Sequence, residues 1–274
     1  MMYGINVQIF GEYHDPTVLV DLACEAENSG WDGFFIWDHI EGETPFCDPT
    51  VALSAIAQRT DRIKLGAMIT PLPRRRPWKV AREMVSLDHL SRGRVIMGVG
   101  LGHPPTEYSK FGEEPEARLR AEKLDESLDI ITGLWSGKRF SYKGNHYQLE
   151  EVIFQPKPVQ RPRIPILVGG FWPSKPPFRR AARYDGVFPT MNWPNELTTT
   201  DLRNILAYIK KHRDVEGSFD VMIGGSTQGD PRRGAEVVEP WIEAGATWWS
   251  ENINSWRGSL EEMRERIKQG PPKI

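Results

Sequence analysis

The sequence predicts an α/β fold of the (β/α)8 type, the TIM barrel. Short apolar, β-branched runs alternate with amphipathic stretches along the whole chain, and eight of each can be counted. A length of 274 residues suits eight such units. The even spread of apolar residues shows no boundary, so we expect a single domain over residues 1–274. An open doubly wound sheet is the alternative, because periodicity does not show closure.

Strands are expected at the short apolar runs, which cover residues 4–10, 33–37, 63–69, 94–99, 164–168, 186–189, 219–223 and 246–250. Helices are expected between them, at residues 17–29, 49–59, 78–90, 118–135, 178–183, 200–212, 235–244 and 259–268. The first helix places Val18, Leu22 and Ala26 on one stripe. It stops before Gly30, as expected of a helix that ends on a left-handed residue. Pro77 precedes the third helix, where proline is natural in the first turn.

The segment 138–163 interrupts this alternation. It contains strand-like pieces and then several prolines after residue 150. We interpret it as an insertion between the fourth helix and the fifth strand, a hairpin with an extended lead-in. Such a hairpin could cover the mouth of the barrel.

Composition excludes several classes of protein. Hydrophobic residues make up 39%, charged residues 26%, and the net charge is −2, which is typical of a soluble globular protein. The run Arg74 to Arg76 is too short and too well balanced by acids to predict nucleic-acid binding. No apolar stretch approaches the ~20 residues of a membrane span, and the first ten residues lack the pattern of a signal peptide. With only Cys24 and Cys47, we expect a cytoplasmic protein without disulfides or a thiolate zinc site.

Asp38 and His39 are the first candidate functional residues, because they end the second strand. The carboxyl ends of parallel strands are where ligands bind, so a carboxylate and an imidazole there indicate a site. The alternative is that the pair caps the following loop. Taken alone, the pair does not decide between the two.

Glycines follow the fourth and fifth strands. Gly98, Gly100 and Gly102 alternate with other residues before His103, and glycine lets a backbone approach a flat ligand closely. The spacing is neither a Rossmann fingerprint nor a P-loop. Gly169 and Gly170 end the fifth strand with exposed amides that could hold phosphate oxygens, although a tight turn explains the pair equally well.

Taken together, these segments resemble the bacterial luciferase-like family of flavin- and deazaflavin-dependent oxidoreductases, over nearly the whole chain. The segments that carry the resemblance are Trp37-Asp-His39, Leu65-Gly-Ala-Met-Ile-Thr-Pro with Arg76-Pro77, Leu87-Asp-His-Leu-Ser-Arg-Gly-Arg94, Gly98-Val-Gly-Leu-Gly102, Glu107-Tyr108 and Tyr184-Asp-Gly186. The resemblance implies a TIM barrel, often a homodimer, that binds FMN or the deazaflavin coenzyme F420 in its mouth. It also implies a bulge after the third strand, with a non-proline cis peptide between Met68 and Ile69 that supports the ring.

The resemblance assigns roles to the candidate residues. The cofactor-binding residues would be Asp38, Met68, Ile69, Gly98, Gly100, Gly102, Gly169 and Gly170. His39 would move a proton, with Asp38 orienting it. His103 would be a second acid or base, or a loop residue without a catalytic role. It stands where the sugar-phosphate dehydrogenases of the family carry an acid, which puts that substrate class in doubt.

Other residues are ambiguous. Phe171, Trp172 and Trp193 follow strands and could line an apolar substrate pocket or simply close the core. Arg232 and Arg233 lie where barrels often bind phosphate, but a solvated pair explains them better. We expect Asp88 and His89 to be structural, and His14, His146 and His212 show no ligand spacing.

The leading hypothesis is therefore an oxidoreductase that transfers a hydride, or activates oxygen, at a reduced cofactor to act on a small organic substrate. The Asp-His pair together with the glycines favours coenzyme F420 slightly over FMN. A separate reductase would supply the reduced cofactor in a two-component monooxygenase. The alternatives are a flavin-binding barrel that has lost catalysis and a metal-dependent hydrolase, although no His-x-His pattern follows the first strand.

Overall fold

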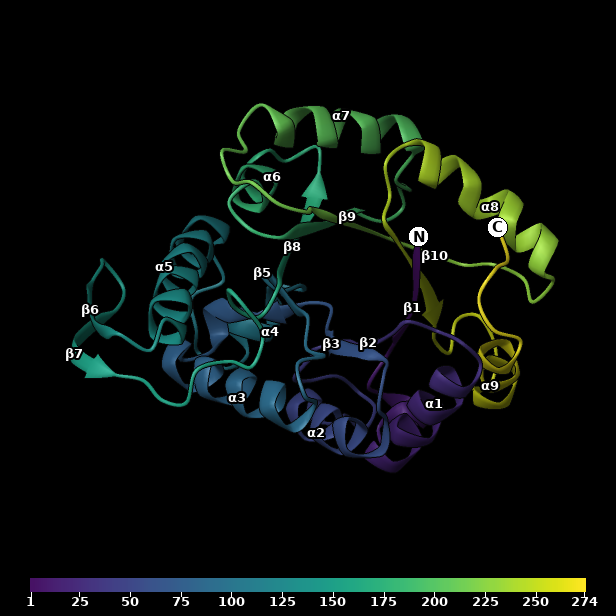
Figure 1. Ribbon diagram of the computed structural model, residues 1–274, viewed down its shortest axis with the longest axis horizontal. Helices are drawn as coiled ribbons and strands as arrows, with labels where there is room; N and C mark the ends of the chain where they lie inside the picture. Colours follow the sequence, from purple (N-terminus) through teal and green to yellow (C-terminus); the bar gives the residue numbers. More distant parts are fainter.

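The structure is a computed structural model that describes residues 1–274, apart from the side chain of Pro231. Its main sheet runs in the order β3-β2-β1-β11-β10-β9-β8-β5-β4, and every pairing within it is parallel. A further parallel bridge between Leu65 of the third strand and Val95, just before the strand Met97–Gly100, closes the sheet. Figure 1 shows the resulting ring of strands with helices outside it. The predicted barrel is confirmed.

The barrel strands lie close to the predicted runs. They are β1 (Met2–Val7), β2 (Gly33–Ile36), β3 (Lys64–Ala67), β4 (Thr70–Pro71), β5 (Met97–Gly100), β8 (Ile166–Trp172), β9 (Gly186–Met191), β10 (Asp220–Gly225) and β11 (Trp248–Ile253). The third predicted strand, 63–69, is too long. β3 ends at Ala67, Met68 and Ile69 leave the ladder and are joined by a cis peptide, and β4 begins beyond the predicted run, at Thr70.

The helices also follow the prediction. The eight expected ones are α1 (Pro16–Asn28), α2 (Pro49–Arg59), α3 (Pro77–Leu90), α5 (Ala117–Trp135), α6 (Pro176–Ala181), α7 (Thr199–Lys210), α8 (Pro231–Glu243) and α9 (Leu260–Lys268). The sequence prediction missed α4 (Thr106–Ser109) and the 3-10 turns η1 (Gly11–Tyr13) and η2 (Leu72–Arg74). Gly30 has a φ of 87°, so the left-handed stop after α1 is confirmed.

Two apolar layers stabilise the barrel. The larger one packs the outward-facing residues of the strands, such as Ile5 and Val7, against the helices. The smaller one fills the interior with Phe35, Met68, Ile96, Leu167, Met222 and Trp248. Because side chains alternate along a strand, this pattern also identifies which residues face inward. None of the helices described above is both long and apolar enough to cross a membrane.

The insertion forms the expected antiparallel hairpin, β6 (Arg139–Lys143) and β7 (Gln148–Ile153). It does not cover the mouth, however, and that expectation is wrong. The buried carboxylate of Glu126 on α5 accepts hydrogen bonds from the backbone N–H groups of residues 145, 146 and 147 at the hairpin turn. Tyr147 packs edge-on against Trp78 of α3. These contacts hold the hairpin on the outside of the helical layer, as Figure 1 shows.

Candidate functional site

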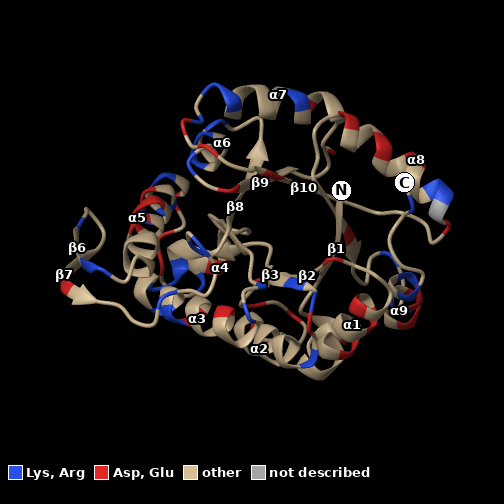
Figure 2. Cartoon of the chain, viewed as in Figure 1, with Lys and Arg blue, Asp and Glu red and all other residues tan. Residues whose placement is uncertain are grey.

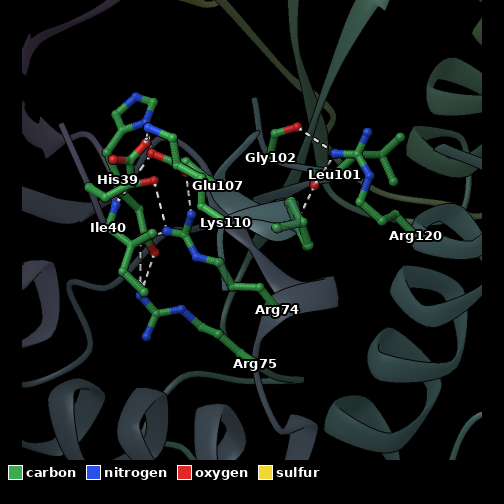
Figure 3. Close-up of polar contacts among 12 residues, drawn as sticks. His39, Ile40, Arg74, Arg75, Leu101, Gly102, Glu107, Lys110 and Arg120 are labelled. Carbon is green, nitrogen blue, oxygen red and sulfur yellow. Dashed lines mark hydrogen bonds and ion pairs between the residues drawn. The ribbon is translucent and has the colours of Figure 1, made fainter. Parts of the chain in front are cut away.

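His39 lies just after β2 and is fixed by a carboxylate from another part of the chain. Its Nδ1 atom lies 2.8 Å from Oε1 of Glu107 on α4. Because a carboxylate can only accept, Nδ1 carries the hydrogen and donates it. Figure 3 shows the second ring nitrogen pointing away from this contact. The His39 side chain is 27% exposed, and its Nε2 makes no hydrogen bond to any residue that the structure describes.

Asp38 makes different contacts from those expected. Its carboxylate accepts hydrogen bonds from Arg74 at 2.6 Å and from Arg75 at 2.8 and 2.9 Å. Burial raises the pKa of Asp38, while the charges of Arg75 and Arg74 oppose that rise. The expectation that Asp38 orients His39 is therefore wrong. Asp38 instead anchors the two arginines that follow β4.

Arg74 links the two acids into one network (Figure 3). It binds Oε2 of Glu107 and, in addition to the Asp38 carboxylate, the Asp38 carbonyl oxygen. Burial alone would raise the pKa of Glu107, but the hydrogen bond and charge of His39, together with Arg74, outweigh it and the pKa is lowered. Glu107 is thus held as an anion beside His39. A charge-assisted network of this kind keeps the imidazole in one orientation.

The bulge between β3 and β4 explains why glycines occupy the neighbouring strands. A Cβ atom at Gly98 would lie 2.4 Å from the carbonyl oxygen of Ala67 and 2.5 Å from Sδ of Met68. A Cβ at Gly100 would lie 2.5 Å from Cδ1 of Ile69, and one at Gly169 would lie 2.8 Å from its Cγ2. The structure therefore gives these glycines a packing role against the bulge, and the cis peptide expected at Met68–Ile69 is present.

The loop after β5 is held firmly up to Gly102. Tyr108 Oη donates to the carbonyl oxygen of Leu101 at 2.6 Å, and Arg120 donates to the carbonyls of Leu101 and Gly102. Gly102 has a φ of 79°, which other residues rarely adopt. His103 comes next and is exposed. It makes no hydrogen bond to any described residue, and its ring contacts Phe171 of β8 at a centroid distance of 5.6 Å.

Three other candidates, Gly170, Trp172 and Trp193, lie in β8 or follow β9. Gly170 faces outward, because a Cβ there would lie 2.2 Å from Cβ of Pro177. Trp172 packs against Phe178 of α6 and donates to Asp201 of α7, which is a role in the helical layer. Trp193 is 92% exposed.

A group of aromatic side chains, which we call the aromatic wall, lies beside His39. We define it as Phe10, Trp37, Phe46 and Trp256, which follow β1, β2 and β11 or lie before α2. The rings of Phe10 and Trp37 lie 6.4 and 5.8 Å from the His39 ring, centroid to centroid. Phe10 contacts all three other members, and Trp37 contacts Trp256 at 5.7 Å. Trp256 is 73% exposed, so the wall is open at its outer end.

The inner face of β1 and β11 carries buried oxygens without partners. They are Oδ1 of Asn6, Oγ of Ser250 and Oδ1 of Asn254. Asn6 and Ser250 share the inward-facing alternation of Trp248, and Asn254 follows the end of β11. Buried polar atoms are nearly always hydrogen-bonded, so these acceptors point to a bound polar group or water in the barrel.

The remaining sequence candidates are structural or peripheral. Asp88 accepts hydrogen bonds from the backbone N–H groups of Val159 and Gln160, and His89 contacts the carbonyl of Lys157, which confirms a structural role. Arg232 and Arg233 are exposed at the start of α8. No group of three or more His, Cys, Asp or Glu side chains among those described is placed to hold a metal ion.

The sequence analysis missed Glu107, Arg74 and Arg75 as site residues. Glu107 is separated from His39 by 68 positions, and nothing in the local pattern connects them. The available signal was a set of three consecutive arginines directly after a barrel strand, where buried acids are the natural partners.

Comparisons with known proteins identify the family of the chain. A family model described as luciferase-like monooxygenase matches residues 4–271. The chain is 33% identical over 199 residues to an F420-dependent glucose-6-phosphate dehydrogenase of Microbacterium testaceum, which covers 70% of this chain and 57% of that protein. It is 34% identical over 223 residues, 74% of each chain, to an uncharacterised protein of Mycobacterium tuberculosis. The chain thus spans little more than half the length of the dehydrogenase.

Solved structures share the fold at lower identity. An F420-dependent secondary alcohol dehydrogenase aligns over 99% of this chain and 98% of its own, with a TM-score of 0.81 and 18% identity. A monooxygenase from Streptomyces bottropensis aligns over 98% and 97%, with a TM-score of 0.80 and 18% identity. With the family model spanning nearly all of the sequence, the chain belongs to the luciferase-like monooxygenase family.

Proposed function

We propose that this protein is a deazaflavin-dependent oxidoreductase that transfers a hydride between its cofactor and a small organic substrate, with His39 as the group that moves the proton. The observation that carries this proposal is the contact between His39 and Glu107. It fixes Nδ1 as the donor to the carboxylate and leaves Nε2 free to take or give a proton at the mouth.

The residues present fit a flat ring cofactor. The bulge at Met68 and Ile69 interrupts the sheet at the carboxyl end of the barrel, and the glycines beside it have no side chains that would occupy the space there. Across the barrel, Asn6 and Ser250 supply buried acceptors that have no partner. A ring with polar edges would satisfy such acceptors, and Gly169 is a candidate for a backbone contact to it.

The cofactor, when bound in its reduced form, supplies the hydride. The protein orients the reactants and controls the proton. Glu107 holds the imidazole of His39, and Arg74 holds Glu107 together with Asp38. Because Asp38, Arg74 and Glu107 are buried and bonded to one another, we expect the imidazole to be oriented in advance, which favours proton transfer.

The identity of the cofactor rests on the relatives. Six F420-dependent glucose-6-phosphate dehydrogenases are 30–33% identical to parts of this chain, which supports the deazaflavin over FMN. Binding of FMN would instead favour a two-component monooxygenase that receives reduced flavin from a separate reductase.

The substrate we propose has an apolar or aromatic body. The aromatic wall offers rings beside His39, whereas a sugar phosphate needs cations to bind its phosphoryl group. His103 also replaces the acid expected of sugar-phosphate dehydrogenases. We therefore place the substrates among uncharged alcohols, ketones or activated alkenes that carry an apolar group.

The test is a fluorescence titration of the purified protein with coenzyme F420 and FMN in parallel, followed by turnover on a substrate panel. We expect tight binding of the deazaflavin and activity with apolar substrates. Binding of neither cofactor would refute the proposal. Binding without turnover on a broad panel would favour a non-catalytic carrier, the alternative that the replacement at His103 suggests.

A further inference from the structure

Gln8 is a fully buried polar residue that lies just beyond the end of β1. Burying a carboxamide is costly unless its donor and its acceptor are both paired. In Gln8 both are paired: Nε2 donates to the carbonyl oxygen of Phe10 at 3.1 Å, and Oε1 accepts from the backbone N–H of Ser255 at 3.2 Å. The hydroxyl of Ser255 contacts the same two atoms of Gln8, at 3.2 and 3.3 Å.

These hydrogen bonds connect loops at the mouth that are far apart in the sequence. Phe10 follows β1, whereas Ser255 follows β11 and is 247 positions from Gln8. The loop after β1 is itself bridged to the loop after β2, through the antiparallel pair of Phe10 and Phe46. Gln8 therefore extends a line of contacts that runs from the loop after β2, through the loop after β1, to the loop after β11.

Trp256 is the most exposed member of the aromatic wall. Since 73% of its side chain is exposed, burial contributes little to fixing its position. Its ring contacts Trp37 at 5.7 Å and Phe10 at 6.1 Å, centroid to centroid, and both of those residues belong to other loops. The place of Trp256 in the wall therefore depends on how the backbone of its own loop is held.

That backbone is anchored on both sides of Trp256. Arg257 donates to the buried carboxylate of Glu251 at 2.7 Å, which fastens the loop to β11, its own strand. Ser255 is held by Gln8, which belongs to a different strand end. Of the two anchors, Gln8 is the one that connects the loop of Trp256 to the rest of the aromatic wall.

The Gln8 connection is made by a neutral group in an uncharged part of the barrel. β1 contains no Lys, Arg, Asp or Glu, whereas Figure 2 shows charged residues on most of the surrounding helices. A carboxamide donates and accepts hydrogen bonds without carrying a charge. It can therefore join two loops beside an aromatic surface and leave that surface suited to an uncharged ligand.

We propose that Gln8 is a positioning residue that sets the substrate preference of the mouth. It holds Trp256 in a fixed place relative to Phe10, so that the aromatic wall is formed before a substrate binds. The inference rests on the proposed function, because it concerns the same substrate site. Loss of Gln8 should therefore weaken the binding of substrates that have an aromatic group and leave proton transfer at His39 unchanged.

The kinetic test compares Gln8→Met with Gln160→Met. Methionine is close to glutamine in length but lacks the amide. Gln160 is the control, because its amide also joins two segments, through Asp88 and Val95, but at the amino ends of β5 and β8, away from the mouth. For a substrate with an aromatic group, Gln8→Met should raise KM roughly three- to tenfold, as expected for a lost hydrogen-bonded contact, with little change in kcat. Gln160→Met should leave both constants unchanged.

A double variant tests whether Gln8 acts through Trp256. In Trp256→Ala the ring is already absent, so adding Gln8→Met should change KM by less than about twofold. Full, additive effects of the two substitutions would overturn the inference. If Gln8→Met does not fold, the exposed Ser255 decides, since Ser255→Ala removes only the hydroxyl contacts to Gln8. A raised KM in that variant would support the inference, and an unchanged KM would overturn it.

A measurement without cofactor or substrate separates this inference from the proposed function. Protein labelled with 5-fluorotryptophan gives a ¹⁹F signal for Trp256, which is assigned by its loss in Trp256→Phe. We expect this signal to shift or broaden in Gln8→Met and to stay in place in Gln160→Met. An unmoved signal in Gln8→Met would overturn the inference and leave the function standing. Failure of the unaltered protein to bind either cofactor would overturn the function, and the inference with it.

Discussion

Nδ1 of His39 donates to Oε1 of Glu107 at 2.8 Å, across 68 positions of the chain. The contact joins the end of β2 to the short helix α4, so the His39 imidazole is held by a segment that lies far from it along the chain. Glu107 also accepts a hydrogen bond from Arg74, which comes from a third segment, η2. The position of the imidazole therefore depends on three loops at the mouth rather than on β2 alone.

Replacing His39 should impair catalysis and leave the fold intact. In His39→Ala we expect turnover to fall by ~10²- to 10⁴-fold, the usual contribution of a general acid or base. The cofactor should still bind, and the melting temperature should change little because His39 is partly exposed. Full turnover in this variant would remove His39 from the mechanism.

Replacing Glu107 should disturb the orientation of His39. Glu107→Gln keeps the shape but removes the charge that faces both Arg74 and His39. We expect turnover to fall by about tenfold or more, with Glu107→Asp partly restoring it. The ¹⁵N chemical shifts of His39 should show that Nδ1 is no longer the preferred site of the hydrogen. An unchanged tautomer would mean that Glu107 acts only through stability.

A methyl group at Gly98 should destabilise the barrel. Its Cβ would lie 2.4 Å from a backbone oxygen, so the bulge has to shift, and overpacking of this kind costs ~1–3 kcal/mol. Gly224→Ala in β10 is the control, since the nearest atom to its Cβ would be 3.6 Å away. Denaturant unfolding of both variants measures the difference. Equal free energies of unfolding for the two variants would show that the bulge can shift at little cost.

The effect of Glu27 on stability should depend on pH. Burial alone would raise its pKa, but hydrogen bonds from the backbone N–H groups of Ile63, Arg62 and Asp61 lower it below the usual range. A lowered pKa means that the ionised form stabilises the fold above the unfolded-state pKa of ~4.3, and that this is lost as pH falls through the folded-state value. Glu27→Gln should therefore cost about 1–3 kcal/mol at pH 7 and progressively less below pH ~4. A constant difference from pH 7 to pH 3 would contradict this.

Trp256 tests the proposed substrate class. Trp256→Ala removes an exposed ring from the aromatic wall without opening the core. For a substrate with an aromatic group, we expect KM to rise by about tenfold, the order of one lost apolar contact surface, and kcat to change little. A small substrate without such a group, measured beside it, should be unaffected. Equal effects on both would indicate a general disturbance of the mouth.

Much of the fold could be predicted because it is encoded locally. The period of apolar residues located every barrel strand except β4 and the eight helices α1 to α3 and α5 to α9, and the left-handed Gly30 marked the end of α1. The break after Ala67 could not be predicted from the residues themselves, since 63–69, apart from Lys64, has the pattern of one apolar strand. It followed only from the resemblance to a family with a bulge at that point.

Part of the site could also be predicted, because it too is encoded locally. His39 and Asp38 stand at a strand end, which is a local feature, and the structure places both at the mouth. The pairing of carboxylates with basic side chains is determined by the closed barrel, because closure brings distant segments together. Asp38 and His39 are adjacent in sequence yet contact different partners, Arg75 and Glu107. The position of the hairpin was likewise decided by Glu126 on a distant helix.

The fit of Ile69 against Gly100 and Gly169 also constrains how this barrel can change in evolution. A methyl group at Gly100 would lie 2.5 Å from Cδ1 of Ile69, and one at Gly169 would lie 2.8 Å from its Cγ2, so either change requires Ile69 to shift or to be replaced by a smaller residue. The three positions are therefore coupled, and the effects of exchanging them singly between related barrels should not add up to the effect of exchanging all three together.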